Sequence, residues 1–347
     1  FAEVNRAGGI RGHKLQLVVL GDGYEPERTA PNMRELIDKH QVLAVVGNVG
    51  TSTVVAAIPI ANSSQVPFLG AFTGAGVLRK SPPDRYVINY RASYAKETAA
   101  MIDMLIDQQG LKPEQIGFFT QRDSYGDAGY SGGIAALKRH GLADVSRIAH
   151  GRYERNTIAV ENGLADLLTD TPPLRAVIMV GAYRPCAHFI QYAHDYGFEA
   201  QFLNVSFVGA APLAAALGEV GDGVLVTQVV PAPDSYFPIT RNFRAALRAM
   251  KPEARASYGS LEGYIVGKIV IGVLQKMRQT PTREGLIDTM ESLGTFGLGL
   301  GNPLSLGTQE HQASHEIWWS EIRQGTVLPM QMVRNRELHT EPKIVGP

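Results

Sequence analysis

The amino-acid sequence predicts an α/β protein of two lobes, each with a mainly parallel sheet flanked by helices. Two observations carry this prediction. Short apolar stretches of strand length alternate with longer stretches of helical periodicity, which is typical of parallel α/β sheets. The alternation runs through two comparable series, and a chain of 347 residues fits two cores better than one oversized core.

The first series builds one lobe. A helix expected over residues 1–7 ends at Gly8 and Gly9, because glycine commonly ends helices. Pro26 opens the next helix, since proline is favourable in a first helical turn. The expected strands are residues 14–20, 43–47, 67–70 and 86–89, and the expected helices are residues 27–40, 53–62 and 96–109.

The second series repeats this plan and then changes character. Its expected strands are residues 116–120, 145–148, 176–180, 201–205 and 223–228, and its expected helices are residues 129–140, 158–168, 186–196 and 212–217. From residue 231 the pattern becomes helical, with segments 239–250, 257–277 and 282–292 before the glycine-rich residues 294–301. Residues 316–322 and 327–333, around Gln324 and Gly325, predict an antiparallel hairpin.

Composition narrows the range of partners. The 33 basic and 33 acidic residues cancel, so no strong field attracts nucleic acid or anionic lipid. The single cysteine, Cys186, excludes an internal disulfide and a multi-cysteine metal site. The apolar residues 264–274 are interrupted by Lys268 and fall short of the roughly 18 needed to span a bilayer. We therefore expect a small or locally recognised partner, with no cofactor or metal.

The segment 45–53 is the most informative motif. An apolar strand runs into a glycine-bearing turn, and Thr51 and Ser52 follow at the start of a helix. Open backbone amides and the positive end of the helix dipole favour an anion there, and the two hydroxyls add donors. A carboxylate would fit. Capping of the helix by Thr51 or Ser52 explains either residue alone at least as well.

Other strand ends add candidates. The strand ending at Gly70 leads to Phe72 and Thr73, at the same sheet edge as Thr51. In the second series, Tyr125 and Tyr183 each follow a strand. A tyrosine there covers an apolar ligand while its hydroxyl reaches a polar group, although lone loop tyrosines usually serve packing.

Nucleotide binding and catalysis have weaker support. No lysine follows the 47–50 turn, and its glycines do not form the dinucleotide fingerprint. No catalytic serine elbow or zinc-binding helix motif occurs. His311 and His315 are four residues apart, but we expect them to be solvated, and we expect Cys186 to be a buried apolar residue.

At these residues the sequence resembles the periplasmic branched-chain amino acid binding protein family, the type I solute-binding proteins of ABC importers. The resemblance covers nearly the whole chain. Its most recognisable pieces are residues 3–12, 47–53, 123–126 and 181–185.

The resemblance implies a type I periplasmic binding protein fold with three crossovers at the hinge, near Arg91, Val229 and Gly307. Lobe one would then comprise residues 1–91 plus 230–307, and lobe two residues 92–229 plus 308–347. It also implies a ligand held between the lobes. The resemblance implies Thr51, Phe72 and Thr73 of lobe one and Tyr125 and Tyr183 of lobe two as ligand-binding residues. We add Ser52 for its hydroxyl at the helix start and Ser206 as the position that matches the family's ammonium partner.

This sequence departs from the family pattern in two places. Amino-acid-binding members have an acidic residue for the ligand ammonium where this chain has Ser206. Members also have a strand and a ligand-contacting loop ahead of the helix in which this chain begins, so we expect the native protein to be longer.

The expected function is that of a periplasmic receptor, exported by an N-terminal signal, that delivers a small carboxylate to its ABC permease. The ligand would be an aromatic, keto or hydroxy acid, or an amino acid. We expect a monomer without enzyme activity. The alternatives are an intracellular sensor with the same fold or an α/β enzyme, for which Asp123 and Glu262 are the best candidate bases.

Overall fold

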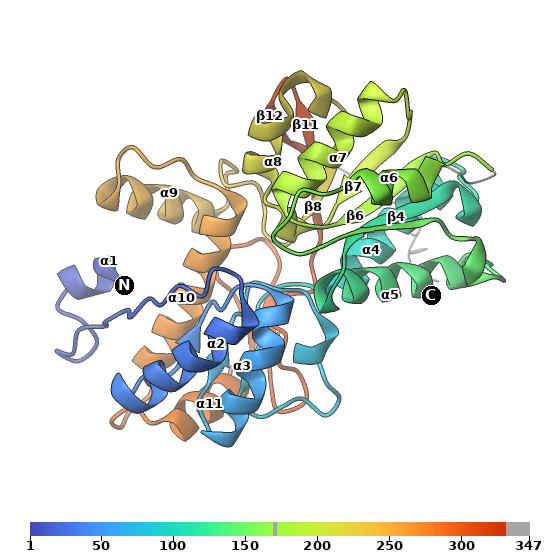
Figure 1. Cartoon of the computed structure of the whole chain (residues 1–347). Coiled ribbons are helices and arrows are strands. Elements are labelled where there is room, and N and C mark those ends of the chain that lie inside the picture. Colours follow the sequence, from blue (N-terminus) through green and yellow to red (C-terminus); the bar gives the residue numbers. More distant parts are fainter. Residues whose placement is uncertain (169–171, 331–347) are drawn as a thin grey trace, which may run out of the picture.

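The computed structural model describes residues 1–168 and 172–330, and it confirms the predicted fold class. Each lobe has one main sheet, and helices cover both faces of each main sheet (Figure 1). In Figure 1 lobe one lies at the lower left, with α2, α3 and α11, and lobe two at the upper right, with α4 to α8.

The lobe-one sheet is parallel, in the order β1-β2-β3. Its strands are β1 (Val45–Val46), β2 (Phe68–Leu69) and β3 (Val87–Ile88). Alternate residues face opposite sides, so Phe68 packs against α2 (Pro26–Arg34) and α3 (Thr51–Ser63). Leu69 faces the other core, with α9 (Pro238–Met250), α10 (Tyr258–Lys276) and α11 (Arg283–Glu291).

The lobe-two sheet has the order β12-β11-β8-β7-β6-β4-β5. Its parallel strands are β4 (Ile116–Gln121), β5 (His150–Tyr153), β6 (Ala176–Val180), β7 (Gln201–Asn204) and β8 (Leu225–Gln228). On one face lie α4 (Tyr94–Asp103) and α5 (Ser124–Arg139), and on the other α6 (Glu161–Leu168), α7 (Tyr183–Asp195) and α8 (Ala210–Leu217). The predicted hairpin, β11 (Trp318–Arg323) with β12 (Thr326–Met330), completes the sheet, and its expected residues 331–333 lie outside the described residues.

Three chain passages join the lobes. They run between β3 and α4, between β8 and α9, and between β10 (Leu304–Leu306) and β11. The predicted lobe boundaries at residues 91, 229 and 307 stay predictions. Strand β10 pairs with β9 (Gly294–Phe296) in a small antiparallel sheet, which the glycine-rich pattern of residues 294–301 did not predict.

The strand predicted over residues 14–20 is wrong. The side chain of Asn5 in α1 (Ala2–Arg6) hydrogen-bonds both backbone groups of Leu15. It accepts from the Leu15 N–H and donates to the Leu15 carbonyl, at 2.8 Å each. No described strand pairs with this segment, and Leu17 and Val19 are 63% and 76% exposed. Apolar sequence alone does not make a strand without a hydrogen-bonded neighbour.

The strand predicted over residues 145–148 is also misplaced. Asp144 accepts a hydrogen bond from the backbone N–H of Ser146 at 2.9 Å, and Val145–Arg147 forms a 3₁₀ turn. The true strand, β5, begins at His150. Its alternation of His150 and Arg152 with the buried Gly151 and Tyr153 is the pattern of a half-exposed edge strand.

No helix among residues 1–168 and 172–330 has the length and apolar character that crossing a bilayer requires.

Candidate functional site

Two hydroxyl groups meet where the lobe-one strands end. Strand β1 leads through Gly47 and Gly50, both with positive φ, to Thr51, the first residue of α3. The neighbouring strand β2 leads to Thr73. The hydroxyls of Thr51 and Thr73 lie 2.7 Å apart, and both side chains are buried. The predicted convergence of these strand ends is therefore present in the structure.

Lobe two faces this pair with the start of α5. The carboxylate of Asp123 caps the helix, accepting from the backbone N–H groups of Tyr125 at 3.0 Å and Gly126 at 3.5 Å. This cap starts the helix at Ser124, five residues before the predicted start. Tyr125 is fully buried, and its hydroxyl donates to the carbonyl of Gly181 at 3.3 Å.

Five aromatic rings gather between the lobes, and we call them the aromatic cluster. Phe207 is at its centre, with ring centroids 4.7 Å from Tyr125, 5.6 Å from Phe72 and 6.1 Å from Tyr24. Tyr94 joins through Tyr125, at 5.2 Å. Rings from both lobes therefore pack against one another, and Phe72 is adjacent in sequence to Thr73.

A buried ion pair adjoins the aromatic cluster. Arg91, 1% exposed, lies with its guanidinium carbon 4.4 Å from the centre of the Phe72 ring. Its Nε and Nη2 atoms approach the two carboxylate oxygens of Glu262 at 3.0 and 3.2 Å, and Nη2 also donates to the Ser206 hydroxyl at 2.9 Å. Burial acts to lower the pKa of Arg91, but the Glu262 carboxylate and further negative groups raise it. Arg91 is therefore a permanent buried cation.

A second buried carboxylate, Glu97, lies on the other side of Ser206. It accepts from the backbone N–H of Ser206 at 2.7 Å, from the Ser206 hydroxyl at 3.0 Å and from the Thr227 hydroxyl at 2.6 Å. Burial raises the pKa of both Glu97 and Glu262, and the Arg91 guanidinium opposes the rise. Acidic groups are therefore present near Ser206, although Ser206 itself is neutral.

The lobes also touch at the edge of this region. The Ser52 hydroxyl donates to Asp123 at 2.5 Å, and the Gln121 amide donates to the Tyr24 hydroxyl at 3.1 Å. Arg155 of lobe two forms an ion pair with Glu25 of lobe one at 2.9 Å. We call the group of side chains made of the Thr51–Thr73 pair, the aromatic cluster and Arg91 the interlobe site.

The structure brings together most of the predicted ligand-binding residues. Thr51, Phe72, Thr73 and Tyr125 belong to the interlobe site, and Ser206 reaches it through Arg91. Ser52 contacts the opposite lobe through Asp123. Tyr183 packs against the core between α7 and the sheet, and its hydroxyl accepts from Arg184 at 3.1 Å.

Sequence reasoning missed Arg91, Tyr94, Tyr24 and Phe207. Arg91 lies on the passage that follows β3 and Tyr94 begins α4; the sequence signal was a lone arginine shortly after a buried strand. Tyr24 precedes α2 with a φ of 63°, a conformation that a motif search does not reveal.

Other candidates lie elsewhere. His311 is 4% exposed, so the expectation that it is solvated is wrong: its Nδ1 atom lies 2.9 Å from the Val87 carbonyl and its Nε2 atom 3.1 Å from Glu291. His315 is 44% exposed in its side chain. Cys186 is fully buried, as predicted.

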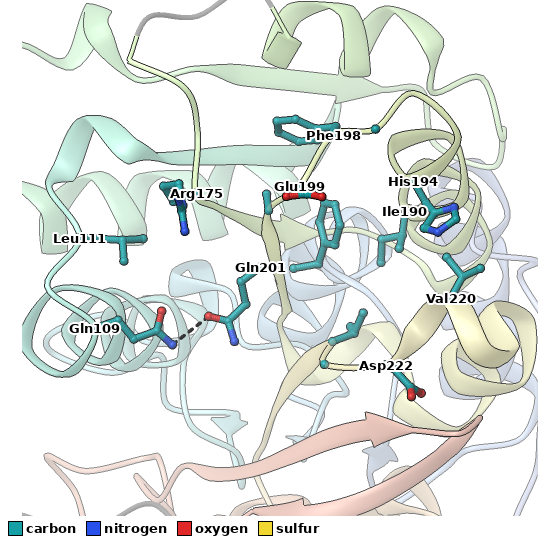
Figure 2. Close-up of a pocket in the computed structure, with 15 residues that line it drawn as sticks. Gln109, Leu111, Arg175, Ile190, His194, Phe198, Glu199, Gln201, Val220 and Asp222 are labelled. Carbon is teal, nitrogen blue, oxygen red and sulfur yellow. Dashed lines mark hydrogen bonds between the residues drawn. The ribbon is translucent and has the colours of Figure 1, made fainter.

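A cavity of about 700 Å³ lies at the opposite edge of lobe two, where strands β6 to β8 begin (Figure 2). Arg175, His194 and Gln201 line it, and the Gln109 amide donates to Gln201 at 2.9 Å. Because ligands of α/β sheets bind beyond the carboxyl ends of strands, this edge is the less favourable one.

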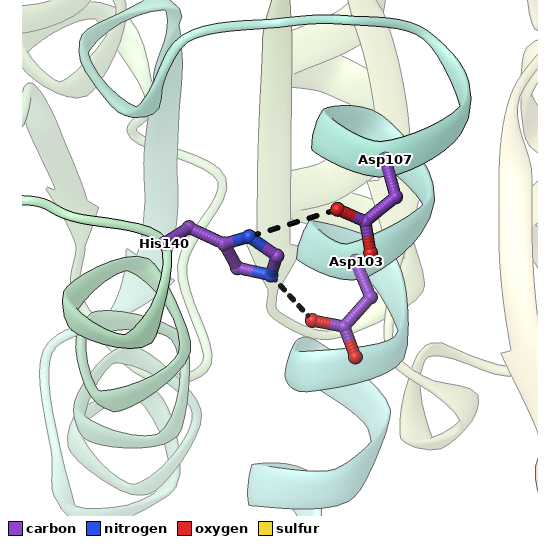
Figure 3. Close-up of side chains that lie close together, drawn as sticks. All are labelled: Asp103, Asp107 and His140. Carbon is purple, nitrogen blue, oxygen red and sulfur yellow. Dashed lines mark hydrogen bonds and ion pairs between the residues drawn. The ribbon is translucent and has the colours of Figure 1, made fainter.

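Asp103, Asp107 and His140 form a cluster with metal-ligand residue types between α4 with its π-helical continuation (Met104–Gln108) and the end of α5 (Figure 3). The two ring nitrogens of His140 face different carboxylates, Nε2 at 2.8 Å from Asp103 and Nδ1 at 3.8 Å from Asp107. One metal ion binds only one nitrogen of a ring, so this arrangement fits ion pairs between the two helices better than a metal site.

Comparison with known proteins gives the family. A family model described as periplasmic binding protein matches residues 1–326. The crystal structure of a possible leucine/isoleucine/valine-binding protein from Rhodopirellula baltica SH 1 is similar at 51% identity and a TM-score of 0.93, over 95% of this chain and 89% of that chain.

Two curated proteins are more distant relatives. The Leu/Ile/Val-binding protein of Escherichia coli K12 is 21% identical over 275 residues, which are 74% of this chain and 67% of the relative. An amino acid binding protein of Pseudomonas aeruginosa is 23% identical over 239 residues, which are 65% of this chain. The match spans only 59% of the length of that Pseudomonas protein.

Proposed function

Because this chain belongs to the branched-chain amino acid binding family of periplasmic binding proteins, we propose that it is the extracytoplasmic solute-binding receptor of an ABC importer. In this proposal the two lobes close on a small carboxylate and the protein delivers it to the cognate permease. The ligand is an aromatic, keto or hydroxy acid, or an amino acid.

The observation that carries the proposal is the position of the Thr51–Thr73 pair. The two buried hydroxyls lie 2.7 Å apart at the N-terminus of the 13-residue helix α3. Helix N-termini favour anions, because open backbone N–H groups and the helix dipole point at the bound group. A carboxylate at this place accepts from both hydroxyls and from the start of α3.

The aromatic cluster supports a ligand with an apolar body. Tyr24 and Phe72 come from lobe one, and Tyr125 and Phe207 come from lobe two. Aromatic side chains provide large apolar contact areas with specific geometry, so rings from both lobes suit a flat or branched hydrocarbon group. Enclosure by both lobes requires that the hinge opens before the ligand enters.

A binding role accounts for the titratable groups better than catalysis does. Asp123 caps α5 and accepts from Ser52 and Gln121, and Glu262 is paired with Arg91. A general base needs a free lone pair within reach of a substrate proton. These partners leave both carboxylates occupied, so we expect ligands to be released unchanged.

The test is a thermal-shift screen across amino acids, aromatic acids and aliphatic acids, followed by calorimetry, since binding to the native state raises the melting temperature. We expect a small acid to bind. The double variant Thr51→Val, Thr73→Val should weaken its binding by about 2–4 kcal/mol, because hydrogen bonds to a charged group are lost.

Thr98→Val is the matched control. Thr98 is also buried, but its hydroxyl donates to the Tyr94 carbonyl within α4. Its loss should leave the affinity unchanged. A screen in which neither acids nor amino acids bind contradicts the proposed function, and full affinity in the double threonine variant contradicts this placement of the carboxylate.

A further inference from the structure

The interlobe site has hydrogen-bond donors without acceptors, whereas its two buried carboxylates already have donors. Glu97 accepts three hydrogen bonds, two from Ser206 and one from Thr227, at 2.6–3.0 Å. Each of its oxygens therefore has at least one donor. Glu97 is fully buried, so no solvent competes for it.

Glu262 also has a partner, the Arg91 guanidinium group. Its two oxygens lie 3.0 Å from Nε and 3.2 Å from Nη2 of Arg91, a side-on ion pair in which Nη2 donates the hydrogen bond. Releasing Glu262 to a ligand ammonium would leave the Arg91 charge buried and unpaired. The cost of an unpaired buried charge is large compared with one new contact. Neither buried carboxylate is thus available to a ligand cation.

Two donors of this site make no hydrogen bond of normal geometry with the described residues. They are the Nη1 atom of Arg91 and the hydroxyl of Tyr94, both buried, and the Tyr94 hydroxyl lies within reach of the Thr73 side chain. Side-on pairing with Glu262 leaves Nη1 as the outward corner of the guanidinium group, whose face Phe72 covers. Only a group in the plane of the guanidinium can reach Nη1.

The backbone holds both donors in position. The backbone N–H of Tyr94 donates to the Gly74 carbonyl at 2.8 Å, one residue after Thr73. The ring fits only because position 74 is glycine, since a Cβ there would lie 2.7 Å from a ring carbon. The carbonyl of Arg91 accepts from Arg79 at 2.8 Å. Buried groups that are fixed but unsatisfied call for a ligand atom.

We propose that Arg91 and Tyr94 form an anion anchor that selects acids without an amino group, the 2-oxo acids above all. This inference rests on the proposed function. The carboxylate is held by the Thr51–Thr73 pair, and Arg91 and Tyr94 donate to the adjacent 2-oxo oxygen. An α-ammonium group in the same place faces the Arg91 cation and has only neutral hydroxyl oxygens as acceptors, with no free carboxylate, so amino acids bind more weakly.

The first test is calorimetric titration of two matched series. One is phenylpyruvate, phenyllactate and phenylalanine, and the other is 4-methyl-2-oxopentanoate, 2-hydroxy-4-methylpentanoate and leucine. We expect each oxo acid to bind at least about tenfold more tightly than its amino acid. Tighter binding of the amino acids overturns the anion anchor while the proposed function stands. No binding in either series overturns the anion anchor, and the proposed function is contradicted only if the full screen of acids and amino acids also finds no ligand.

The second test removes one donor. Tyr94→Phe should weaken oxo-acid binding about tenfold and leave the amino acids unchanged, while the melting temperature stays equal or rises because an unsatisfied hydroxyl is gone. Tyr90→Phe is the matched control, since the equally buried Tyr90 hydroxyl already donates to the Val229 carbonyl. Full oxo-acid affinity in a folded Tyr94→Phe protein overturns the role of Tyr94.

The third test concerns the charge. Arg91→Lys keeps a cation beside Glu262 but removes the Nη1 donor. The paired variant Arg91→Met with Glu262→Met removes both charges together. We expect oxo-acid affinity to fall in each, and the preference over amino acids to disappear in the paired variant. Full oxo-acid affinity in either folded variant, or an unchanged preference in the folded paired variant, overturns the role of Arg91.

Discussion

Close packing around single residues decides how lobe one presents its side of the interlobe site. Gly50, the N-cap of α3, has a φ of 97°, and a Cβ on it would lie 2.1 Å from the Tyr24 ring. Glycine is therefore required at position 50 for two reasons: the positive φ, and the space that the Tyr24 ring occupies. The Tyr24 hydroxyl then accepts from Gln121 of the other lobe. One glycine thus positions both the helix start and a contact between the lobes.

His150 makes the stability of lobe two depend on pH. Burial and the neighbouring Arg152 lower the pKa of His150 to about 4. The unfolded value is about 6.5, so the folded protein binds fewer protons between these two pH values. The stabilisation is fully present above pH 6.5 and is lost as the pH falls towards 4. We expect protonation of His150 alone to lower the unfolding free energy by about 1–2 kcal/mol between pH 7 and pH 4.5.

Urea unfolding at the two pH values measures this effect. His150→Gln should lose less stability on acidification than the unmodified protein, whereas His194→Gln should not differ from it, because His194 is exposed. An equal acid loss in the His150 variant would contradict the assignment.

At single residues, sequence predicts local chemistry and misses long-range partners. Thr51 and Thr73 were predictable because neighbouring parallel strands end at one sheet edge. Arg91 was not, because its partner Glu262 is 171 positions away on α10. The absence of an acid at position 206 was visible, but Glu97 beside it was not, since the two meet only through the fold.

Helix α5 shows how packing overrides propensity in a whole element. Its sequence contains four glycines, which disfavour helix, yet it runs without interruption from Ser124 to Arg139. The glycines allow close approach: a Cβ on Gly132 would lie 2.6 Å from the Cα of Ala95 on α4, and one on Gly133 would lie 2.4 Å from the Phe118 ring. The sequence-based prediction began this helix at Gly129 and missed its first five residues, which the Asp123 cap starts.

Gly132→Ala should therefore destabilise lobe two by about 1–2 kcal/mol, because overpacking against α4 exceeds the gain in helix propensity. Chemical unfolding measures the loss. The adjacent, exposed Ser131→Ala is the control and should change stability by no more than about 0.5 kcal/mol. A Gly132 variant as stable as the control would show that the helices have room to separate.

The elements that sequence located poorly are those with partners far along the chain. Residues 14–20 have the composition of a strand but no neighbouring strand pairs with them, and the Asn5 side chain hydrogen-bonds the backbone N–H and carbonyl of Leu15. Strand β5 has polar residues on one face and was placed five residues too early. The central strands β4 and β6 are buried throughout, and their apolar runs gave their positions closely.

The whole molecule consists of two packed lobes whose contacts converge on one region. Hydrogen bonds and an ion pair cross between the lobes, at Ser52–Asp123, Tyr24–Gln121 and Glu25–Arg155. Exposed ion pairs contribute little each, about 0–1 kcal/mol. Contacts of this strength close the lobes without preventing them from opening, which is what exchange of a ligand requires.

Pulsed electron spin resonance between one spin label on each lobe tests closure most directly. Val55→Cys on α3 and Glu154→Cys, both at the edge of the interlobe region, are exposed labelling positions. Cys186 is buried and burial raises the pKa of its thiol, so it should not react. A control pair within lobe two, Lys138→Cys with Glu154→Cys, should show one fixed distance.

With a saturating acid, we expect the distance between Val55→Cys and Glu154→Cys to shorten and its distribution to narrow, and the control pair to stay unchanged. That result would show that two lobes close on a small acid. An identical distance distribution with and without ligand, under conditions where calorimetry shows binding, would contradict the account.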